Sequence, residues 1–249
     1  MVANVYQYNN DYQRLVTLAL KQQPDTILLV ETDKAWQSGI AGLEKMYNHK
    51  ILLPMDNTYG MLFYSKLPIV QHEVMYLIHD DIPSIKLTLL LESGDEVLMI
   101  CIHPKPPMPQ HSKESSDRDA EILLAGKMAK AYGGPSIIMG DLNDVAWSHT
   151  TRIFLRTSSM ADPRRGRGLF STFHAKVPFF RWPLDHIFLS HHFGVVNMQV
   201  LDSIGSDHFP IWIKAAITPQ PTATILHADE GDVKEANEKI AEGSKKATQ

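Results

Sequence analysis

Short apolar runs alternate with longer amphipathic stretches along the chain of 249 residues. Apolar runs of roughly five to seven residues, bounded by turn formers and rich in β-branched residues, predict β-strands. We expect strands at Val2–Tyr6, Thr26–Val30, Gly60–Ser65, Ile85–Leu91, Val97–His103, Ser136–Gly140, Asp185–Ser190 and Ile211–Ile217.

Four amphipathic stretches between these runs predict helices, because their apolar residues recur at helical spacing. Asn10 and Asp33 precede the first two helices as N-cap residues, and Ser116 opens a Ser-x-x-Asp sequence that resembles a capping box. The third helix is expected to stop at Gly133-Gly134. The predicted helices are Asp11–Gln23, Asp33–Tyr47, Ser116–Tyr132 and Trp147–Thr157.

The order of these elements predicts a mixed α/β domain of the α+β class. The strands Ile85–Leu91 and Val97–His103 flank the turn Ser93-Gly94-Asp95, which is typical of a hairpin, so a purely parallel sheet is excluded. No linker-like composition interrupts residues 1–217, which we expect to form one domain. Residues 218–249 are rich in Pro, Ala, Glu and Lys, and we expect a polar tail, disordered or weakly helical.

The composition excludes several classes of protein. With 44% hydrophobic and 21% charged residues the chain is an ordinary globular protein, and its net charge of −4 argues against coating nucleic acid through bulk positive charge. Cys101 is the only cysteine, which excludes an internal disulfide and a Cys-rich zinc site. The sequence has no apolar run of about 18 residues that could span a bilayer. Because the first predicted strand follows Met1 directly, we expect a native leader or membrane anchor outside this sequence.

Acidic, amide and imidazole side chains stand at the carboxyl ends of three apolar runs. Glu31 follows the second run, His103 ends the fifth, and Gly-Asp-Leu-Asn at 140–143 places Asp141 and Asn143 after the sixth. Strands that end in one region deliver such groups to a common cleft. Taken singly, each group also fits a helix cap, a turn or an ordinary hydrogen-bonded histidine, so only their combination indicates a site.

The combination resembles the endonuclease/exonuclease/phosphatase superfamily, the metal-dependent phosphoesterases that include deoxyribonuclease and exonuclease III. The resemblance extends from about Ala3 to Ile217. It implies a four-layer αββα sandwich with two mixed β-sheets. The matching residues are Asn4, Glu31, His103, Gly-Asp-Leu-Asn at 140–143, Asp185 and Ser-Asp-His at 206–208.

The resemblance also implies a divalent metal site. Glu31 and Asp207 supply hard oxygen ligands that suit Mg²⁺ (or Mn²⁺), and Asn4 adds a neutral carbonyl oxygen. Zinc is disfavoured because the expected ligands are mostly oxygens.

The other matching residues are expected to act on the phosphate and the attacking water. The carboxylate of Asp185 would hold His208, which serves either as general base or as a phosphate-binding group. Asp141 matches the residue that orients or deprotonates the water, and Asn143 the amide that holds the water or a phosphate oxygen. His103 matches the second histidine of the family, a phosphate ligand or leaving-group acid.

We therefore expect a divalent-metal-dependent hydrolase of phosphoester or phosphodiester bonds, in which water attacks phosphorus. The substrate is left open among a lipid head group, a small phosphoester and nucleic acid, and we expect a monomer. One alternative is an endo- or exonuclease acting on DNA or RNA, although Tyr6 stands where apurinic endonucleases carry an acidic residue. Another is a degenerate phosphate-binding member without turnover.

Two clusters of residues before Asp185, one basic and one aromatic, provide information about the binding partner. Arg164-Arg165-Gly166-Arg167 is either a solvated loop or a cationic rim of the cleft. Phe179-Phe180-Arg181-Trp182 offers aromatic rings to a base, to lipid or to the core, and we expect core burial. The segment 162–185 also resembles bacterial superfamily members with N-terminal membrane helices, which favours an extracytoplasmic, membrane-anchored domain over a cytoplasmic one.

Overall fold

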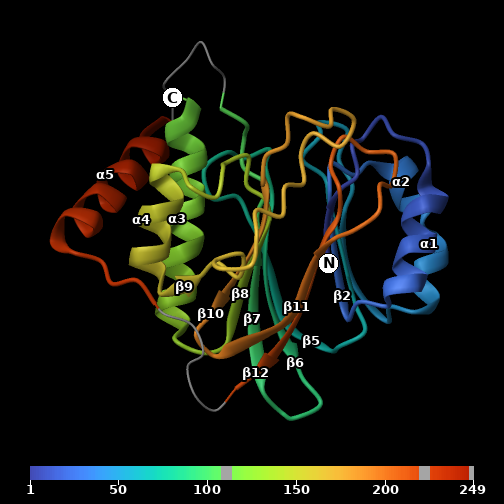
Figure 1. The fold of residues 1–249 in the computed structure, drawn as a ribbon, viewed down its shortest axis with the longest axis horizontal. Helices are drawn as coiled ribbons and strands as arrows, with labels where there is room; N and C mark the ends of the chain where they lie inside the picture. The colour runs from blue at the N-terminus through green and yellow to red at the C-terminus, as the bar shows by residue number, and fades with distance from the viewer. Residues whose placement is uncertain (108–113, 219–224, 247–249) are drawn as a thin grey trace.

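The computed structural model describes residues 1–107, 114–218 and 225–246. Two six-stranded sheets lie face to face, and helices cover the outer face of each (Figure 1). Both sheets contain parallel and antiparallel pairs. The expected α+β fold, a four-layer αββα sandwich with two mixed sheets, is therefore confirmed.

The first sheet contains the N-terminal strand. β1 and β2 are parallel, with Asn4 opposite Val30, whereas the other neighbours in this sheet are antiparallel. The strand order is β11 (Phe193–Val200), β12 (Ile211–Ile217), β1 (Val2–Asn4), β2 (Thr26–Val30), β4 (Met61–Ser65) and β3 (His49–Leu53).

The second sheet also contains one parallel pair, β7 and β8, and its other neighbouring strands are antiparallel. The sequence turn at 93–95 joins β6 to β7, so the predicted hairpin is confirmed. The strand order is β5 (Ile69–Met75), β6 (Ser84–Leu90), β7 (Glu96–Cys101), β8 (Ser136–Asp141), β10 (Asp185–Ser190) and β9 (Met160–Ala161).

Helices α1 (Tyr12–Gln22) and α2 (Lys34–Gly39) cover the first sheet, together with the 3₁₀ helix η1 (Ala41–Lys45) (Figure 1). The Asp33 side chain accepts a hydrogen bond from the Trp36 amide and caps α2 as predicted. The single helix expected over 33–47 is wrong, because the helix is interrupted at Ile40. The N-cap of α1 is Asp11 instead of Asn10.

Helices α3 (Glu114–Tyr132), α4 (His149–Ser158) and α5 (Glu230–Lys246) cover the second sheet. Ser116 lies inside α3, so the capping box expected there is wrong. The side chain of Ser148 caps α4 by accepting a hydrogen bond from the Thr151 amide at 2.8 Å.

Three apolar clusters fill the spaces between the four layers. Strand β4 shows how the sequence builds them, because its side chains alternate between faces. Met61 and Phe63 belong to the cluster between the sheets, whereas Leu62 and Tyr64 belong to the cluster under the first helical layer. A strand buried on both faces has no polar positions, which is why such central strands stand out in the sequence.

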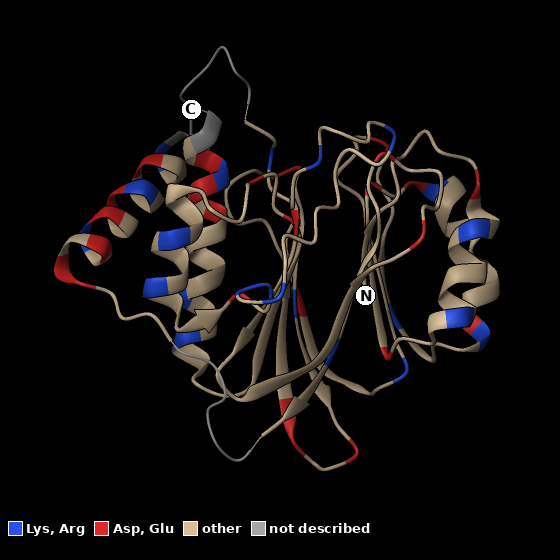
Figure 2. Ribbon diagram, viewed as in Figure 1, with Lys and Arg blue, Asp and Glu red and all other residues tan. Residues whose placement is uncertain are grey.

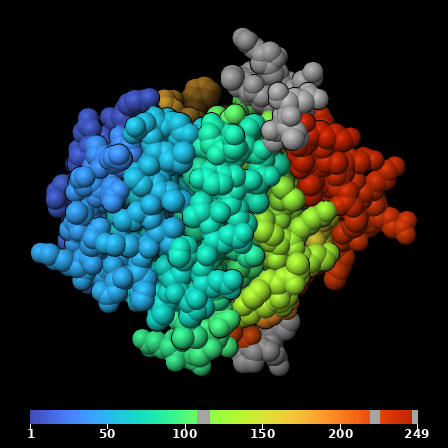
Figure 3. All heavy atoms as spheres, turned by 180° about the vertical axis from the view of Figure 1, so that it is seen from behind, coloured from blue at the N-terminus to red at the C-terminus, as the bar shows by residue number. Residues whose placement is uncertain are grey.

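The expected polar tail includes a helix that packs on the second helical layer. Ala236 of α5 is 3% exposed and belongs to the same apolar cluster as residues of α3 and α4. Lys239 pairs with Asp119 of α3 at 2.7 Å, and Arg156 of α4 pairs with Asp232 at 3.0 Å. Seen from the reverse side, α5 (red) forms one flank of the molecule (Figure 3). Ala236 and Ile240 are the α5 residues in this apolar cluster, and ion pairs make further contacts, so the helix is mostly polar in sequence and its hydropathy resembles that of a tail.

The aromatic cluster before Asp185 is not part of the core. Phe179 is 92% exposed, Phe180 65% and Trp182 41%, so the expected burial is wrong. Charged residues lie mainly on the helices and loops, whereas the strands between them carry few (Figure 2). None of the helices in the described ranges is long and apolar enough to cross a bilayer.

Glu121 of α3 is a buried carboxyl outside the predicted site. It accepts a hydrogen bond from the Ser84 hydroxyl of β6 at 3.0 Å. Burial raises the pKa of Glu121 to about 7, and the Ser84 hydrogen bond opposes this only in part. The folded state therefore holds a proton that the unfolded chain releases above about pH 4.5, so the free energy of unfolding falls as the pH rises from about 4.5 to about 7.

We predict that Glu121→Gln removes this pH dependence. The variant should gain stability over the wild type as the pH rises through this range, up to about 3 kcal/mol above it. Urea unfolding at about pH 5 and about pH 8 measures the gain, with the exposed Glu92→Gln as control. Parallel pH profiles for Glu121→Gln and wild type would contradict a neutral buried carboxyl.

Candidate active site

The two parallel strand pairs deliver four polar residues to the same end of the sandwich. Asn4 ends β1 and Glu31 follows β2 in one sheet, while His103 follows β7 and Asp141 ends β8 in the other. The carboxyl ends of parallel strands lie at the same edge of a sheet, so each pair brings its two residues together. Because the two sheets face each other, Asn4 and Glu31 lie next to His103 and Asp141, as expected from the sequence.

Asn4 bridges the carboxylates of the two sheets. Its Nδ2 donates to Glu31 Oε1 at 2.7 Å and to Asp141 Oδ2 at 3.0 Å. Its Oδ1 accepts from the Tyr6 amide, so the oxygen expected to bind metal faces the backbone in this structure. Burial raises the pKa of Glu31, against the opposing influence of His103 and of the Asn4 hydrogen bond.

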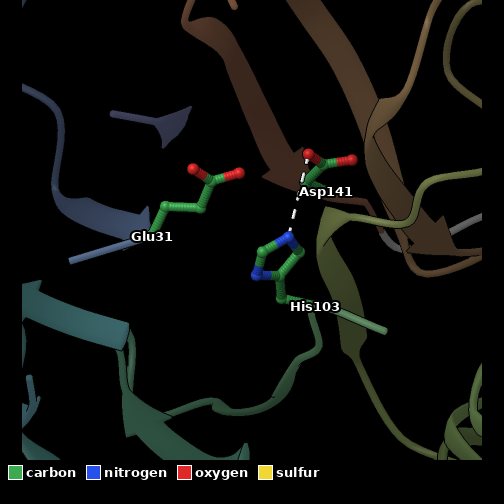
Figure 4. A group of neighbouring side chains, drawn as sticks. All are labelled: Glu31, His103 and Asp141. Carbon is green, nitrogen blue, oxygen red and sulfur yellow. Dashed lines mark ion pairs between the residues drawn. The ribbon is translucent and has the colours of Figure 1, made fainter. Parts of the chain in front are cut away.

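Glu31, His103 and Asp141 point toward one another from three strand ends (Figure 4). Their ligand atoms all lie within 4.8 Å of one another. His103 is buried, with Nε2 at 3.9 Å from Asp141 Oδ2, and its Nδ1 has no hydrogen-bond partner within the described ranges. This cluster is the centre of the site.

A second group shares Asp141 with the first. His208 Nδ1 lies 2.8 Å from Asp185 Oδ2, and its Nε2 lies 3.6 Å from Asp141 Oδ2. The strand register explains the proximity, because Asp185 of β10 stands directly opposite Asp141 of β8. Burial lowers the pKa of His208, but the carboxylates of Asp185 and Asp141 outweigh burial and raise the pKa to about 10.

The Gly-Asp-Leu-Asn loop has the backbone that its sequence requires. A Cβ on Gly140, at φ 155°, would lie 1.8 Å from the Ile102 carbonyl oxygen, so only glycine fits there. Asn143 has a φ of 49°, and its amide donates to Asp141 Oδ1 at 3.0 Å. Its side-chain Nδ2 donates to the Pro104 carbonyl at 3.1 Å, which joins this loop to the segment after His103.

Asp207 is the predicted residue that the structure places apart. It belongs to neither group of candidate metal ligands in the described part of the chain. Its negative charge contributes to the raised pKa of His208, and its carbonyl accepts a hydrogen bond from the Ala175 amide at 2.6 Å. Its role as a metal ligand stays a prediction, whereas Asp141 and His103 lie close enough to Glu31 that one ion could be held by all three.

Arg118 supports the site from α3 and was not predicted from the sequence. Its Nη1 donates to the Asn143 carbonyl at 2.9 Å, and its Nε and Nη2 donate to Asp119 at 3.2 and 2.8 Å. Lys239 of α5 donates to the other oxygen of Asp119 at 2.7 Å. A chain of charged hydrogen bonds thus connects the C-terminal helix to the Asn143 backbone.

A second arginine, the buried Arg164, supports the same loop through His186. Arg164 Nη2 donates to His186 Nδ1 at 2.6 Å, so the proton of the neutral ring is on Nε2, which donates to the Asp144 carbonyl at 2.8 Å. Burial and the Arg164 charge lower the pKa of His186 well below its usual value, which keeps the ring neutral. Arg164 is thus structural, whereas Arg165 and Arg167 are exposed.

The donor set fits a hard divalent cation. Glu31, Asp141 and His103 offer two carboxylates and one imidazole at separations that a single ion can bridge. The buried ring of His103 has Nε2 toward the cluster, 3.9 Å from Asp141 Oδ2, so an imidazole nitrogen is available beside the two carboxylates. Grouped carboxylates repel one another, and a bound cation relieves that repulsion.

The family model of the Endonuclease/Exonuclease/phosphatase family matches residues 1–208 of the chain. The chain therefore belongs to this family, whose members are in general metal-dependent phosphoesterases and nucleases. The resemblance inferred from the sequence is confirmed. No curated protein matches the sequence.

Solved structures share the fold. An endonuclease/exonuclease/phosphatase from Beutenbergia cavernae has a TM-score of 0.73 and 18% identity, covering 93% of this chain and 74% of its own. D. rerio TDP2 complexed with single strand DNA product has a TM-score of 0.70 and 14% identity, with coverage of 86% and 97%. The human Nocturnin catalytic domain with bound sulfate anion has a TM-score of 0.67 and 18% identity, with coverage of 87% and 93%.

We predict that Arg118→Lys lowers kcat by about tenfold and changes KM less than about twofold. The lysine keeps the positive charge, but it cannot hold Asp119 and the Asn143 carbonyl at once, as the guanidinium does. Steady-state kinetics on a soluble phosphodiester measure the split. The exposed Arg152→Lys is the matched control, and thermal unfolding verifies that both variants fold. An unchanged kcat in the folded Arg118→Lys variant would contradict a positioning role.

Proposed function

We propose that the protein is a divalent-metal-dependent hydrolase of phosphodiester bonds. The observation that carries the proposal is the Glu31–His103–Asp141 cluster, whose ligand atoms lie within 4.8 Å of one another beside the His208–Asp185 pair. A phosphodiester is anionic and resists attack by water, so a site for its hydrolysis needs positive charge and an oriented nucleophile. The metal cluster and the charged imidazole supply these next to one another.

Glu31 and Asp141 would hold the ion, Mg²⁺ or Mn²⁺, with His103 at its side. The ion would neutralise phosphate charge and acidify bound water. Asp185 holds His208 Nδ1, so Nε2 of the ring is left to donate to a phosphate oxygen. Because the carboxylates of Asp185 and Asp141 raise the pKa of His208 to about 10, the ring is charged near neutral pH, which favours its phosphate-binding role over the general-base role. Asp141 and the adjacent Asn143 are then the groups to orient the attacking water.

A nuclease is the second candidate, and it has one specific observation in its favour. D. rerio TDP2, which shares the fold, has been solved with a single strand DNA product. Against a nuclease stands the net charge of −4, because DNA affinity comes largely from neutralising phosphates with Lys and Arg. We therefore place a lipid or small phosphodiester first.

A panel of substrates tests the proposal. With Mg²⁺ or Mn²⁺ we expect hydrolysis of bis-p-nitrophenyl phosphate, abolished by EDTA. Glu31→Gln and His208→Ala should each lower the rate about 10²- to 10⁴-fold, because each removes a positioned group. The exposed residues His72 and Glu73 of β5 provide matched controls as His72→Ala and Glu73→Gln, which should keep wild-type rates.

The panel also separates the alternatives. Supercoiled plasmid, sphingomyelin and an inositol polyphosphate accompany the soluble diester, and His208→Ala is assayed beside each. Plasmid nicking that His208→Ala abolishes, without hydrolysis of the other substrates, would establish the nuclease. Equal rates with and without EDTA would refute the metal mechanism. Metal binding at Glu31 without turnover of any substrate would identify a phosphate-binding member that is not an enzyme.

A further inference from the structure

We propose that residues 173–182, here named the aromatic loop, dock the protein on an anionic lipid surface and bring the active site to it. The proposal deepens the proposed function by naming a phosphodiester in a lipid head group as the substrate. Its test is a binding measurement that needs neither metal nor turnover, so it can fail independently of the hydrolase activity.

The aromatic loop exposes large apolar side chains side by side. Phe179 is 92% exposed and Phe180 65%, and the rings of Phe180 and Trp182 lie 6.2 Å apart. Val177 is also exposed at the tip. Adjacent exposed aromatic and aliphatic side chains are uncommon on a protein surface without a partner, and they mark interaction sites.

Backbone hydrogen bonds order the loop that exposes these side chains. Phe173 and Trp182 pair as an antiparallel bridge, and the Thr172 and Phe173 amides both donate to the Trp182 carbonyl, at 3.0 and 2.9 Å. The His174 amide donates to the Phe180 carbonyl at 3.1 Å. Because these bonds hold the loop in one shape, Phe179 stays in solvent unless something outside the fold covers it.

The charge of the surrounding segment is positive. Residues 163–184 contain five Lys or Arg and neither Asp nor Glu, and four of the five are exposed, whereas Arg164 is buried and paired with Asp162. Lys176 and Arg181 lie on the loop itself, and Figure 2 shows basic but no acidic residues on it. Lys176 Nζ lies 5.2 Å from the Tyr6 ring centre, and the Arg181 guanidinium 4.9 Å from that of Phe209. Along the chain Lys176 and Arg181 flank the exposed Phe179 and Phe180, and basic residues next to exposed aromatic side chains are the pattern of an interfacial segment on anionic lipid.

The loop is joined directly to the active site. The Phe173 ring lies 4.9 Å from the His208 ring, and the Ala175 amide donates to the Asp207 carbonyl. The Phe209 amide donates to the Thr172 carbonyl at 2.8 Å. In Figure 1 the loop (amber) lies at the end of the sandwich to which β1 and β2 deliver Asn4 and Glu31. A membrane that covers Phe179 would therefore lie next to His208.

A lipid surface fits the loop better than nucleic acid or a second copy of the chain. Nucleic acid requires a track of cations along its backbone, and the loop has only Lys176 and Arg181, each placed beside an aromatic ring. The Phe179 side chain at the tip has no polar atom to pair with a base. A second copy would bring another loop with the same positive charge, which repels the first.

Vesicle flotation in EDTA tests the proposal. We expect the wild type to bind phosphatidylcholine vesicles that contain phosphatidylserine, and to bind pure phosphatidylcholine more weakly. The double variant Phe179→Ser/Phe180→Ser should bind the anionic vesicles about tenfold more weakly or worse, because two apolar side chains no longer enter the interface. Val196→Ser is the control, since Val196 on β11 is exposed to a similar degree, 61%.

Three outcomes would overturn the proposal. The first is wild-type protein that does not float with anionic vesicles. The second is a double variant that floats like wild type and like Val196→Ser. The third is a double variant whose vesicle binding is unchanged but which differs from wild type in another assay. Weaker binding of labelled single-stranded DNA would assign the loop to nucleic acid, and a smaller sedimentation coefficient would assign it to self-association.

Discussion

The structure depends on one constraint: two carboxylates from different sheets, those of Glu31 and Asp141, are held next to each other in a largely buried position. The Asn4 amide donates to both, and His103 and His208 lie within 4 Å of Asp141. Like charges at such separations repel, and burial strengthens the repulsion. The arrangement is therefore favourable only in a fold that fixes both strand ends and in the presence of positive charge between them. The facing of the two parallel strand pairs meets the first requirement, and a cation held between Glu31 and Asp141 would meet the second.

The elements outside the two sheets explain how that arrangement is kept in place. Arg118 of α3 and His186 of β10 donate to consecutive carbonyls of the loop that follows Asp141, those of Asn143 and Asp144. Arg118 is in turn held by Asp119, which Lys239 of α5 also contacts. A C-terminal helix beyond the residues that match the family model thus reaches the active site through side chains alone. The aromatic loop contacts the site from the remaining side, through Phe173 and His208.

The sequence was sufficient to predict the elements whose burial leaves a local signal. The bounds of β2, β10 and β12 agree with the prediction, and the residues at the strand ends do converge. Four strands were missed, β3, β5, β9 and β11. All four are edge strands, β9 has only two residues and β5 exposes four consecutive residues, so neither an apolar run nor a clean alternation marks them. Arg118 was missed because its role comes from a helix that meets the loop only in three dimensions. The aromatic loop was expected in the core because aromatic side chains favour burial, whereas Phe179 is 92% exposed in the structure.

The most direct test of a metal site between the two sheets is anomalous diffraction at the manganese edge from crystals soaked in Mn²⁺. We predict a peak within about 2.5 Å of carboxylate oxygens of both Glu31 and Asp141, one residue from each sheet. A peak bound by residues of one sheet only, or an active enzyme whose crystals show no peak between these two carboxylates, would contradict it.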